Sequence, residues 1–128
     1  MGSLLYDAGA LVAADRDDQT IWRFHATILR MEERPVVPTP VLAQTWRKAG
    51  QVRLAMLLNG SEIRPLDETL ARAAGRLCGT AKTTDIVDAT VAVLAVSLNA
   101  TVLTSDPHDI TRLVDCLHGL DRVEIVKV

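Results

Sequence analysis

Short apolar runs alternate with longer amphipathic segments along the whole chain. Runs of a few Val, Leu and Ile residues that end at polar turn residues predict strands. The expected strands cover residues 3–6, 36–37, 62–66, 101–104 and 122–126. Between them, apolar residues recur at helical spacing. This alternation predicts an α/β fold with a mostly parallel central sheet covered by helices on both faces.

The expected helices begin near residues 8, 20, 39, 52, 67, 85 and 106. Thr39 before Pro40 predicts an N-cap with proline at the first helical position, and this helix should run to Gly50. Asp67 predicts a second N-cap, and Gly79 is the expected end of its helix. The helix after Asp85 is apolar on nearly every side, which predicts burial in the middle of the domain.

Length and composition indicate one globular domain spanning residues 1–128. The 128 residues are 48% hydrophobic and 23% charged, which is enough for a hydrophobic core. A net charge of −2 gives no overall attraction to phosphate backbones, so contact with nucleic acid requires local basic residues or a metal. The basic candidates, which equally fit a solvated helix face, are Arg23, Arg30, Arg34, Arg47, Lys48 and Arg53.

Cysteine usage and hydropathy indicate the compartment. Cys78 and Cys116 have no metal-ligand spacing, which disfavours structural zinc and fits a reducing cytosol. The longest apolar stretch, residues 89–98, is too short to span a bilayer. Met1-Gly2 does not begin a myristoylation signal, because Tyr6 stands where that signal needs Ser or Thr. We therefore expect a soluble, cytoplasmic protein with no membrane partner.

Four aspartates, Asp7, Asp85, Asp88 and Asp106, each follow an apolar or turn-like run and precede a helix. Taken singly, each fits a helix cap or a first-turn acid, a role that contributes about 1 kcal/mol without any function. Taken together, Asp7 and Asp106 should lie at the carboxyl ends of parallel strands, where ligands bind at a topological switch point. Asp88 and Asp85 lie three residues apart at the start of the buried helix, on nearly the same face.

Several carboxylates within a few ångströms repel one another unless a cation neutralises them. His25, His108 and His118 show no ligand spacing, and oxygen ligands alone favour Mg²⁺ or Mn²⁺. Metal-assisted phosphodiester hydrolysis is the chemistry we expect of such a centre. Ser105 fits two roles equally, a group that orients water or phosphate and a hydroxyl in a turn.

Three short motifs resemble the PIN domain of VapC-type toxins. The sequence LYDAGAL at residues 5–11 resembles the first motif of that family, DIVDA at residues 85–89 the central one, and TSDPHD at residues 104–109 the last. The resemblance implies a three-layer α/β/α sandwich and a Mg²⁺- or Mn²⁺-dependent endoribonuclease. It also implies an RNA substrate, a homodimer and inhibition by a cognate antitoxin.

The resemblance further implies that Asp7, Asp88 and Asp106 bind the metal and carry catalysis, with Asp85 as a supporting acid. Thr104 matches a hydroxyl residue that often precedes the last acid. Gln44 stands where the family usually has glutamate. An amide can ligate a metal or hold a water, but it cannot act as a general base. Two functions therefore remain open: an active RNase toxin, and a weakened or inactive binding module with the same fold.

Overall fold

The computed structural model describes residues 3–128, so Met1 and Gly2, considered above as a lipidation signal, lie outside the described residues. The strands of this part of the chain are β1 (Leu4–Tyr6), β2 (Val36–Pro38), β3 (Glu62–Arg64), β4 (Thr101–Thr104) and β5 (Glu124–Lys127). Its helices are α1 (Ala8–Asp15), α2 (Gln19–Arg30), α3 (Thr39–Thr45), α4 (Val52–Asn59), α5 (Glu68–Ala81), α6 (Ile86–Leu98) and α7 (Pro107–Cys116).

The strands form one sheet in the order β3-β2-β1-β4-β5, and every neighbouring pair is parallel. The expected α/β class is confirmed. From β1 the chain moves outward through β2 to β3, then returns across the sheet to β4 and β5 on the other side of β1. The order therefore reverses between β1 and β4. In such sheets a crevice opens beyond the carboxyl ends of the two strands at the reversal.

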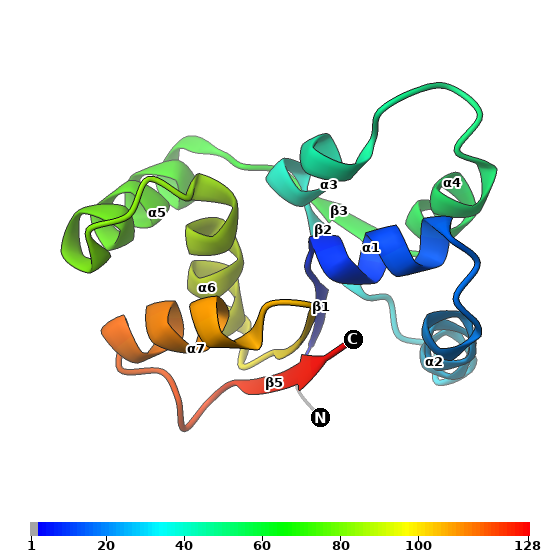
Figure 1. Cartoon of the computed structure of the whole chain (residues 1–128). Helices are drawn as coiled ribbons and strands as arrows, with labels where there is room; N and C mark the ends of the chain where they lie inside the picture. Colours follow the sequence, from blue (N-terminus) through cyan, green and yellow to red (C-terminus); the bar gives the residue numbers. More distant parts are fainter. Residues whose placement is uncertain (1–2) are drawn as a thin grey trace.

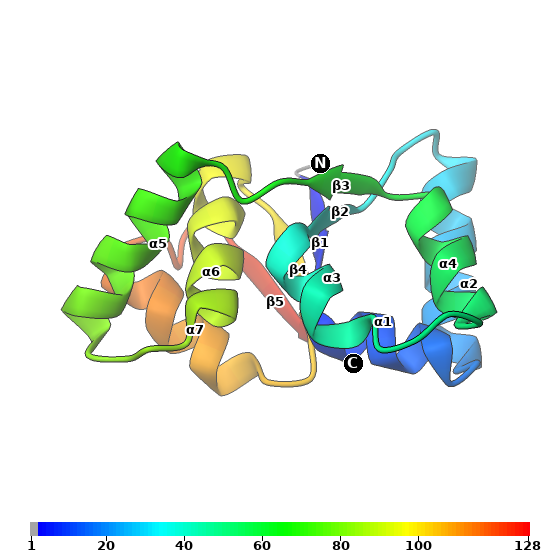
Figure 2. The same cartoon turned by 90° about the horizontal axis from the view of Figure 1, so that it is seen from above.

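The reversal also distributes the helices over two layers. Crossovers between parallel strands are right-handed, so connections that run in opposite directions cover opposite faces of the sheet. Helices α1, α2 and α4 pack together on one side, and α5, α6 and α7 pack together on the other (Figures 1 and 2). Helix α3 contacts both α1 and α6. This is the three-layer arrangement that the sequence predicted.

Burial follows the predicted pattern. Leu5 and Tyr6 of β1 are fully buried, and so are Ala89, Val91 and Ala92 of α6. The most apolar helix therefore packs in the interior, as expected from its composition. Among residues 3–128 there is no helix with the length and hydropathy needed to cross a membrane.

The expected helix over residues 39–50 is wrong at both ends. The Thr39 hydroxyl is not a cap, because it accepts a hydrogen bond from the N–H of Leu66 at 3.0 Å. Helix α3 ends at Thr45, and the Arg47 guanidinium donates to carbonyls of its last turn. The Gln51 side chain accepts the N–H of Arg47 at 2.6 Å. These polar contacts satisfy the groups that a longer helix would have paired.

The expected end at Gly79 is also wrong, because α5 continues to Ala81. Cys78 and Ala81 are buried in the core, so the extra turn keeps an apolar face. The chain leaves the helix at Lys82, which takes the left-handed conformation with φ of 57°. The last strand pairs with β4 over Glu124–Lys127, and the range expected from the sequence, residues 122–126, began too early.

Candidate metal centre

Strand register brings Asp7 beside Thr104. Tyr6 lies opposite Leu103 in the β1–β4 pair, so Asp7, directly after β1, lies beside Thr104, the last residue of β4. The Asp7 N–H donates to the Leu103 carbonyl at 2.9 Å. The Thr104 hydroxyl donates to Asp7 Oδ2 at 2.7 Å and accepts the N–H of Asp106 at 2.9 Å. One buried hydroxyl thus joins acids from opposite ends of the chain.

The second carboxylate oxygen of Asp7 has no partner. Asp7 is only 5% exposed, and its Oδ1 is buried without a hydrogen bond from any residue in 3–128. Asp7 stands at the N-cap position of α1, but its side chain does not cap that helix. A buried charged oxygen without a partner is strongly unfavourable, so this oxygen calls for a proton or a cation.

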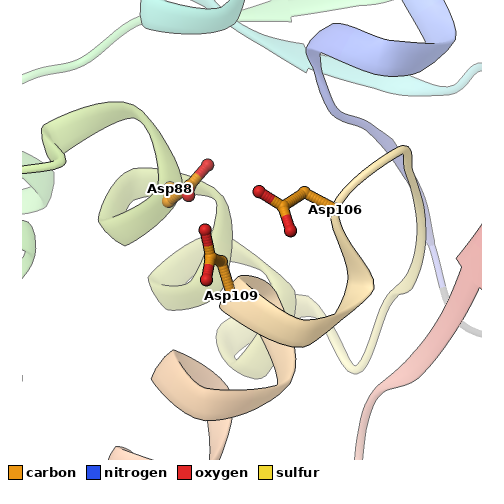
Figure 3. Close-up of side chains that lie close together, drawn as sticks. All are labelled: Asp88, Asp106 and Asp109. Carbon is orange, nitrogen blue, oxygen red and sulfur yellow. The ribbon is translucent and has the colours of Figure 1, made fainter.

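Three more carboxylates gather at the starts of α6 and α7. Asp88, Asp106 and Asp109 each offer an oxygen within 4.8 Å of the other two. Figure 3 shows the three side chains converging on a common space. Asp106 and Asp109 lie on one side of the first turn of α7 because they are three residues apart. Asp106 occupies the N-cap position of α7 without making a cap hydrogen bond.

Burial, hydrogen bonding and neighbouring negative charges raise two carboxyl pKa values. Burial raises the pKa of Asp88 to about 7, and the charges of Asp85, Asp7 and Asp109 add to the effect. A hydrogen bond with Asp106, followed by the charge of Asp106, raises the pKa of Asp109. Without a cation, these carboxyl groups therefore hold protons more readily than ordinary aspartates.

The other predicted residues lie around this cluster in different ways. Asp85 is the N-cap of α6 and accepts the N–H of Asp88 at 3.0 Å, as the cap interpretation expects. Ser105 is exposed beside Asp106. Gln44 lies on the exposed side of α3, and in the described chain its side chain forms no hydrogen bond to Asp7 or Asp106.

Asp109 is the acid that the choice of candidate residues missed. It lies within the motif of residues 104–109, but it does not stand between an apolar or turn-like run and a helix, which is the pattern that marks the other four aspartates. The signal that would have found it is its spacing of three residues from Asp106 in a helix beginning with proline.

Gly9 brings the first turn of α1 into close contact with Ser105, in the turn between β4 and α7. A Cβ atom on Gly9 would lie 2.6 Å from Ser105 Cβ and 2.7 Å from the Ser105 backbone nitrogen. Beside this contact runs a groove of about 410 Å³, and its lining includes Ala8, Gly9, Ser105 and Arg16. Arg16 is exposed and forms no ion pair within residues 3–128. The groove, which Asp18 also lines, therefore places an exposed cation near Ser105, the chain neighbour of Asp106.

Several basic candidates have local roles instead. Arg53 pairs with Asp17 at 3.6 Å, and Arg34 donates to the Ser61 carbonyl at 2.6 Å. His25 is buried, its Nδ1 lies 3.0 Å from the Tyr6 hydroxyl, and burial lowers the pKa of its imidazole. In the part of the chain that the structure describes, the group of potential metal ligands contains only aspartates.

This donor set fits a hard divalent cation. Carboxylate oxygens are the ligands that Mg²⁺ and Mn²⁺ prefer, and the absence of sulfur and imidazole in the group argues against zinc. The unpaired oxygen of Asp7 provides an independent requirement for positive charge at the same edge of the sheet.

Comparison with known proteins agrees with this architecture. The family model described as the PIN domain matches residues 4–114. The chain is also similar to a chain in the crystal structure of VapBC2 from Rickettsia felis bound to a DNA fragment from their promoter, with a TM-score of 0.71. The sequence identity is 15%, and the match covers 98% of each chain, so the likeness is one of fold. No curated protein matches this chain.

Proposed function

The chain belongs to the PIN domain family, and from this premise we propose that it is a metal-dependent endoribonuclease, the toxin of a type II toxin–antitoxin pair. The observation that carries the proposal is the buried, unpartnered oxygen of Asp7 at the switch point of the sheet. The other oxygen of this carboxylate accepts the Thr104 hydroxyl, which in turn accepts the N–H of Asp106. Asp106 converges with Asp88 at the starts of α7 and α6.

Asp7, Asp88 and Asp106 hold Mg²⁺ or Mn²⁺ in this proposal. Such a cation, when bound, polarises a phosphoryl oxygen, lowers the pKa of a bound water and stabilises the leaving oxyanion. Thr104 keeps the Asp7 carboxylate turned toward Asp106, because its hydroxyl donates to one and accepts from the other. Asp85 fixes the first turn of α6 and therefore the position of Asp88.

Two exposed residues complete the proposed site. The Ser105 hydroxyl is beside Asp106 and orients a water or a phosphate oxygen. The Gln44 amide offers a neutral ligand from α3. The groove along α1 receives the RNA strand next to the scissile phosphate, and the free guanidinium of Arg16 faces its backbone. The positive charge of Arg16 is local, in keeping with a chain whose net charge is −2.

The assignment as a toxin rests on the three sequence motifs and on the fold shared with VapBC2, whose description names a complex with promoter DNA. On the same grounds we propose that a cognate antitoxin covers the acidic edge of the sheet. We also propose that the chain forms a homodimer and is located in the cytoplasm. The whole chain acts as a single domain.

The test is cleavage of a mixed RNA pool by the purified protein. Cleavage should require Mg²⁺ or Mn²⁺, and Asp7→Ala should abolish it. Asp115→Asn is the matched control, because it removes a charge from exposed α7 away from the cluster and should leave the rate unchanged. Cleavage that persists in EDTA, or in Asp7→Ala, would contradict the mechanism.

A second candidate function is a binding module with little or no catalytic activity. Gln44 favours it, because an amide at this position lowers the negative charge available to a metal and removes a potential general base. The discriminating variant is Gln44→Glu. Activity in this variant and none in the parent would assign the parent chain to the binding module.

A further inference from the structure

Arg112 joins α7 to the end of α5. Its guanidinium donates a hydrogen bond to the Ala81 carbonyl at 2.5 Å. Ala81 is the last residue of α5, so its carbonyl has no partner inside the helix. The last turn of α5 contains no basic residue, although a cation is stabilising at this end of a helix. Arg112 therefore supplies from α7 both a donor and a positive charge to the end of α5.

This hydrogen bond is the single polar link between these helices. Among residues 3–128, no other hydrogen bond and no ion pair joins α7 to α5, to α6 or to the turn between them. The remaining contact is apolar, since α7 buries Ile110, Leu113 and Val114. Apolar packing is not directional. The hydrogen bond from Arg112 therefore defines the position of α7 along its neighbours more sharply than the packing does.

The turn between α5 and α6 is fixed by hydrogen bonds of its own. The Thr83 hydroxyl accepts the N–H of Asp85 at 3.2 Å, and Asp85 accepts the N–H of Asp88 at 3.0 Å. The Cys78 thiol of α5 donates to the Asp85 carbonyl at 3.8 Å. These contacts connect the end of α5 with the first turn of α6. A shift of Ala81 relative to α7 would therefore move Asp88 as well.

The distance between two proposed ligands depends on this arrangement. Asp106 stands at the start of α7, the helix that carries Arg112, and half-buried Asp88 lies in the first turn of α6. Their carboxylate oxygens approach within 4.8 Å, and Figure 3 shows the two side chains facing each other from separate helices. Whatever holds the start of α6 against α7 therefore sets the spacing of these two acids.

We infer that Arg112 is a positioning residue of the proposed site, which holds the end of α5 against α7 and so sets the distance between Asp88 and Asp106. It acts through the Ala81 carbonyl and is not itself a ligand. The inference rests on the proposed function and adds to it a basic residue outside the acidic cluster.

A purely electrostatic role for Arg112 predicts the opposite result. Arg112 lies three residues after Asp109 on α7, and residues with this spacing lie on one side of a helix. A positive charge beside the acids would by itself repel a metal cation. Removal of Arg112 would then tighten Mn²⁺ binding, whereas the loss of a positioning contact would weaken it.

The test measures the dissociation constant of the full chain for Mn²⁺, by electron paramagnetic resonance of the free ion. Arg112→Met keeps a long side chain without donors or charge, and should raise the dissociation constant by about 10-fold. Arg112→Lys keeps a charged donor and should retain most of the affinity. Arg76→Met is the matched control and should bind as the parent does, because Arg76 is exposed on α5 and has no ion pair within residues 3–128.

RNA cleavage is measured on the same samples. At saturating Mn²⁺, Arg112→Met should cut RNA at nearly the parental rate, because the bound ion then holds the two acids together. Arg112→Gln, whose side chain is shorter than that of arginine, is a second neutral variant with the same expectations. A thermal melt in EDTA verifies that each protein is folded.

An unchanged or smaller Mn²⁺ dissociation constant in the folded neutral variants would overturn the inference, and so would an equal loss of affinity in Arg112→Lys or Arg76→Met. A parent chain that binds Mn²⁺ and cuts no RNA would overturn the proposed function and leave the inference standing. A parent chain that binds no Mn²⁺ would overturn both.

Discussion

The starts of α5 and α7 carry the same sequence signature and use it differently. Asp67 precedes α5, and its Oδ1 accepts the N–H of Leu70 at 2.8 Å, which is an ordinary helix cap. Asp106 precedes α7 and makes no cap hydrogen bond. A cap of this kind contributes about 1 kcal/mol, so Asp106 gives up local stabilisation that its residue type would normally provide.

The same contrast separates the other aspartates at helix starts. Asp18, Asp67 and Asp85 cap their helices, whereas Asp7 and Asp106 do not. The two that do not cap are those that follow β1 and β4, on either side of the point where the strand order reverses. An acid that does not cap its own helix is therefore the better guide to a candidate ligand in this fold.

The largest effect is expected on RNA cleavage, when an acid that does not cap its helix and one that does are each replaced by alanine. Asp106→Ala should lower the rate of metal-dependent RNA cleavage by about 100-fold or more, because it removes a proposed ligand. Asp67→Ala should leave the rate within about twofold, because Asp67 acts only on α5. Initial rates at fixed Mn²⁺ measure both, and equal losses in the two variants would remove the distinction.

A smaller effect is expected at Thr104, which links the two acids that do not cap. Thr104→Val removes the donor to Asp7 and the acceptor for the Asp106 N–H, and should lower cleavage and Mn²⁺ affinity by about 10-fold. Thr104→Ser keeps the hydroxyl and should retain most of both. A valine variant with parental affinity would show that the hydroxyl does not position the acids.

Sequence patterns predicted the fold because its strands are continuous apolar runs and its central helix is apolar on most sides. They indicated Asp7, Asp88 and Asp106 as candidates because these residues stand at or near element boundaries, and their role as ligands stays a prediction. They missed the end of α3, where the Arg47 and Gln51 side chains replace backbone pairing, because such contacts depend on residues that only the fold brings together. The spacing of three residues from Asp106 would have indicated Asp109, whereas its approach to Asp88 depends on the packing of α6 against α7.

Substitutions of a capping acid and of a non-capping acid should change the free energy of unfolding in EDTA in opposite directions. Asp67→Ala should lower the free energy of unfolding by about 1 kcal/mol, because it removes a cap. Asp7→Asn should raise it by roughly 1 kcal/mol, because it removes a buried charge that has an unpartnered oxygen. Urea denaturation measures both. A loss of stability in Asp7→Asn would show that the buried carboxylate is satisfied without a cation.

An effect of similar size is expected in the dependence of stability on pH. The pKa of Asp88 is about 7 in the folded chain and near its ordinary value when unfolded, so the folded state holds the proton more tightly. Stability from this group is complete below about pH 4 and is lost as the pH rises through 7. In EDTA the free energy of unfolding should fall by roughly 1 kcal/mol between pH 5 and 8, because solvent screens part of the effect at this half-buried carboxyl group.

Asp88→Asn should remove most of this pH dependence, and saturating Mn²⁺ should restore stability to the parent at pH 8. Denaturation curves at the two pH values provide the measurement. An unchanged slope in Asp88→Asn would assign the dependence to other groups and weaken the contrast between site acids and capping acids.

The contact between Gly9 and Ser105 couples two positions that lie far apart in the sequence, so substitutions at position 9 are limited by residue 105. A Cβ at position 9 would collide with the backbone of residue 105 as well as with its side chain. A smaller side chain at position 105 would therefore not make room for a larger residue at position 9. In a library with both codons randomised and selected for folding, we expect glycine at position 9 to be retained whatever side chain follows Thr104. Evolution of this chain can therefore vary the hydroxyl residue directly after β4 much more freely than the third residue after Tyr6.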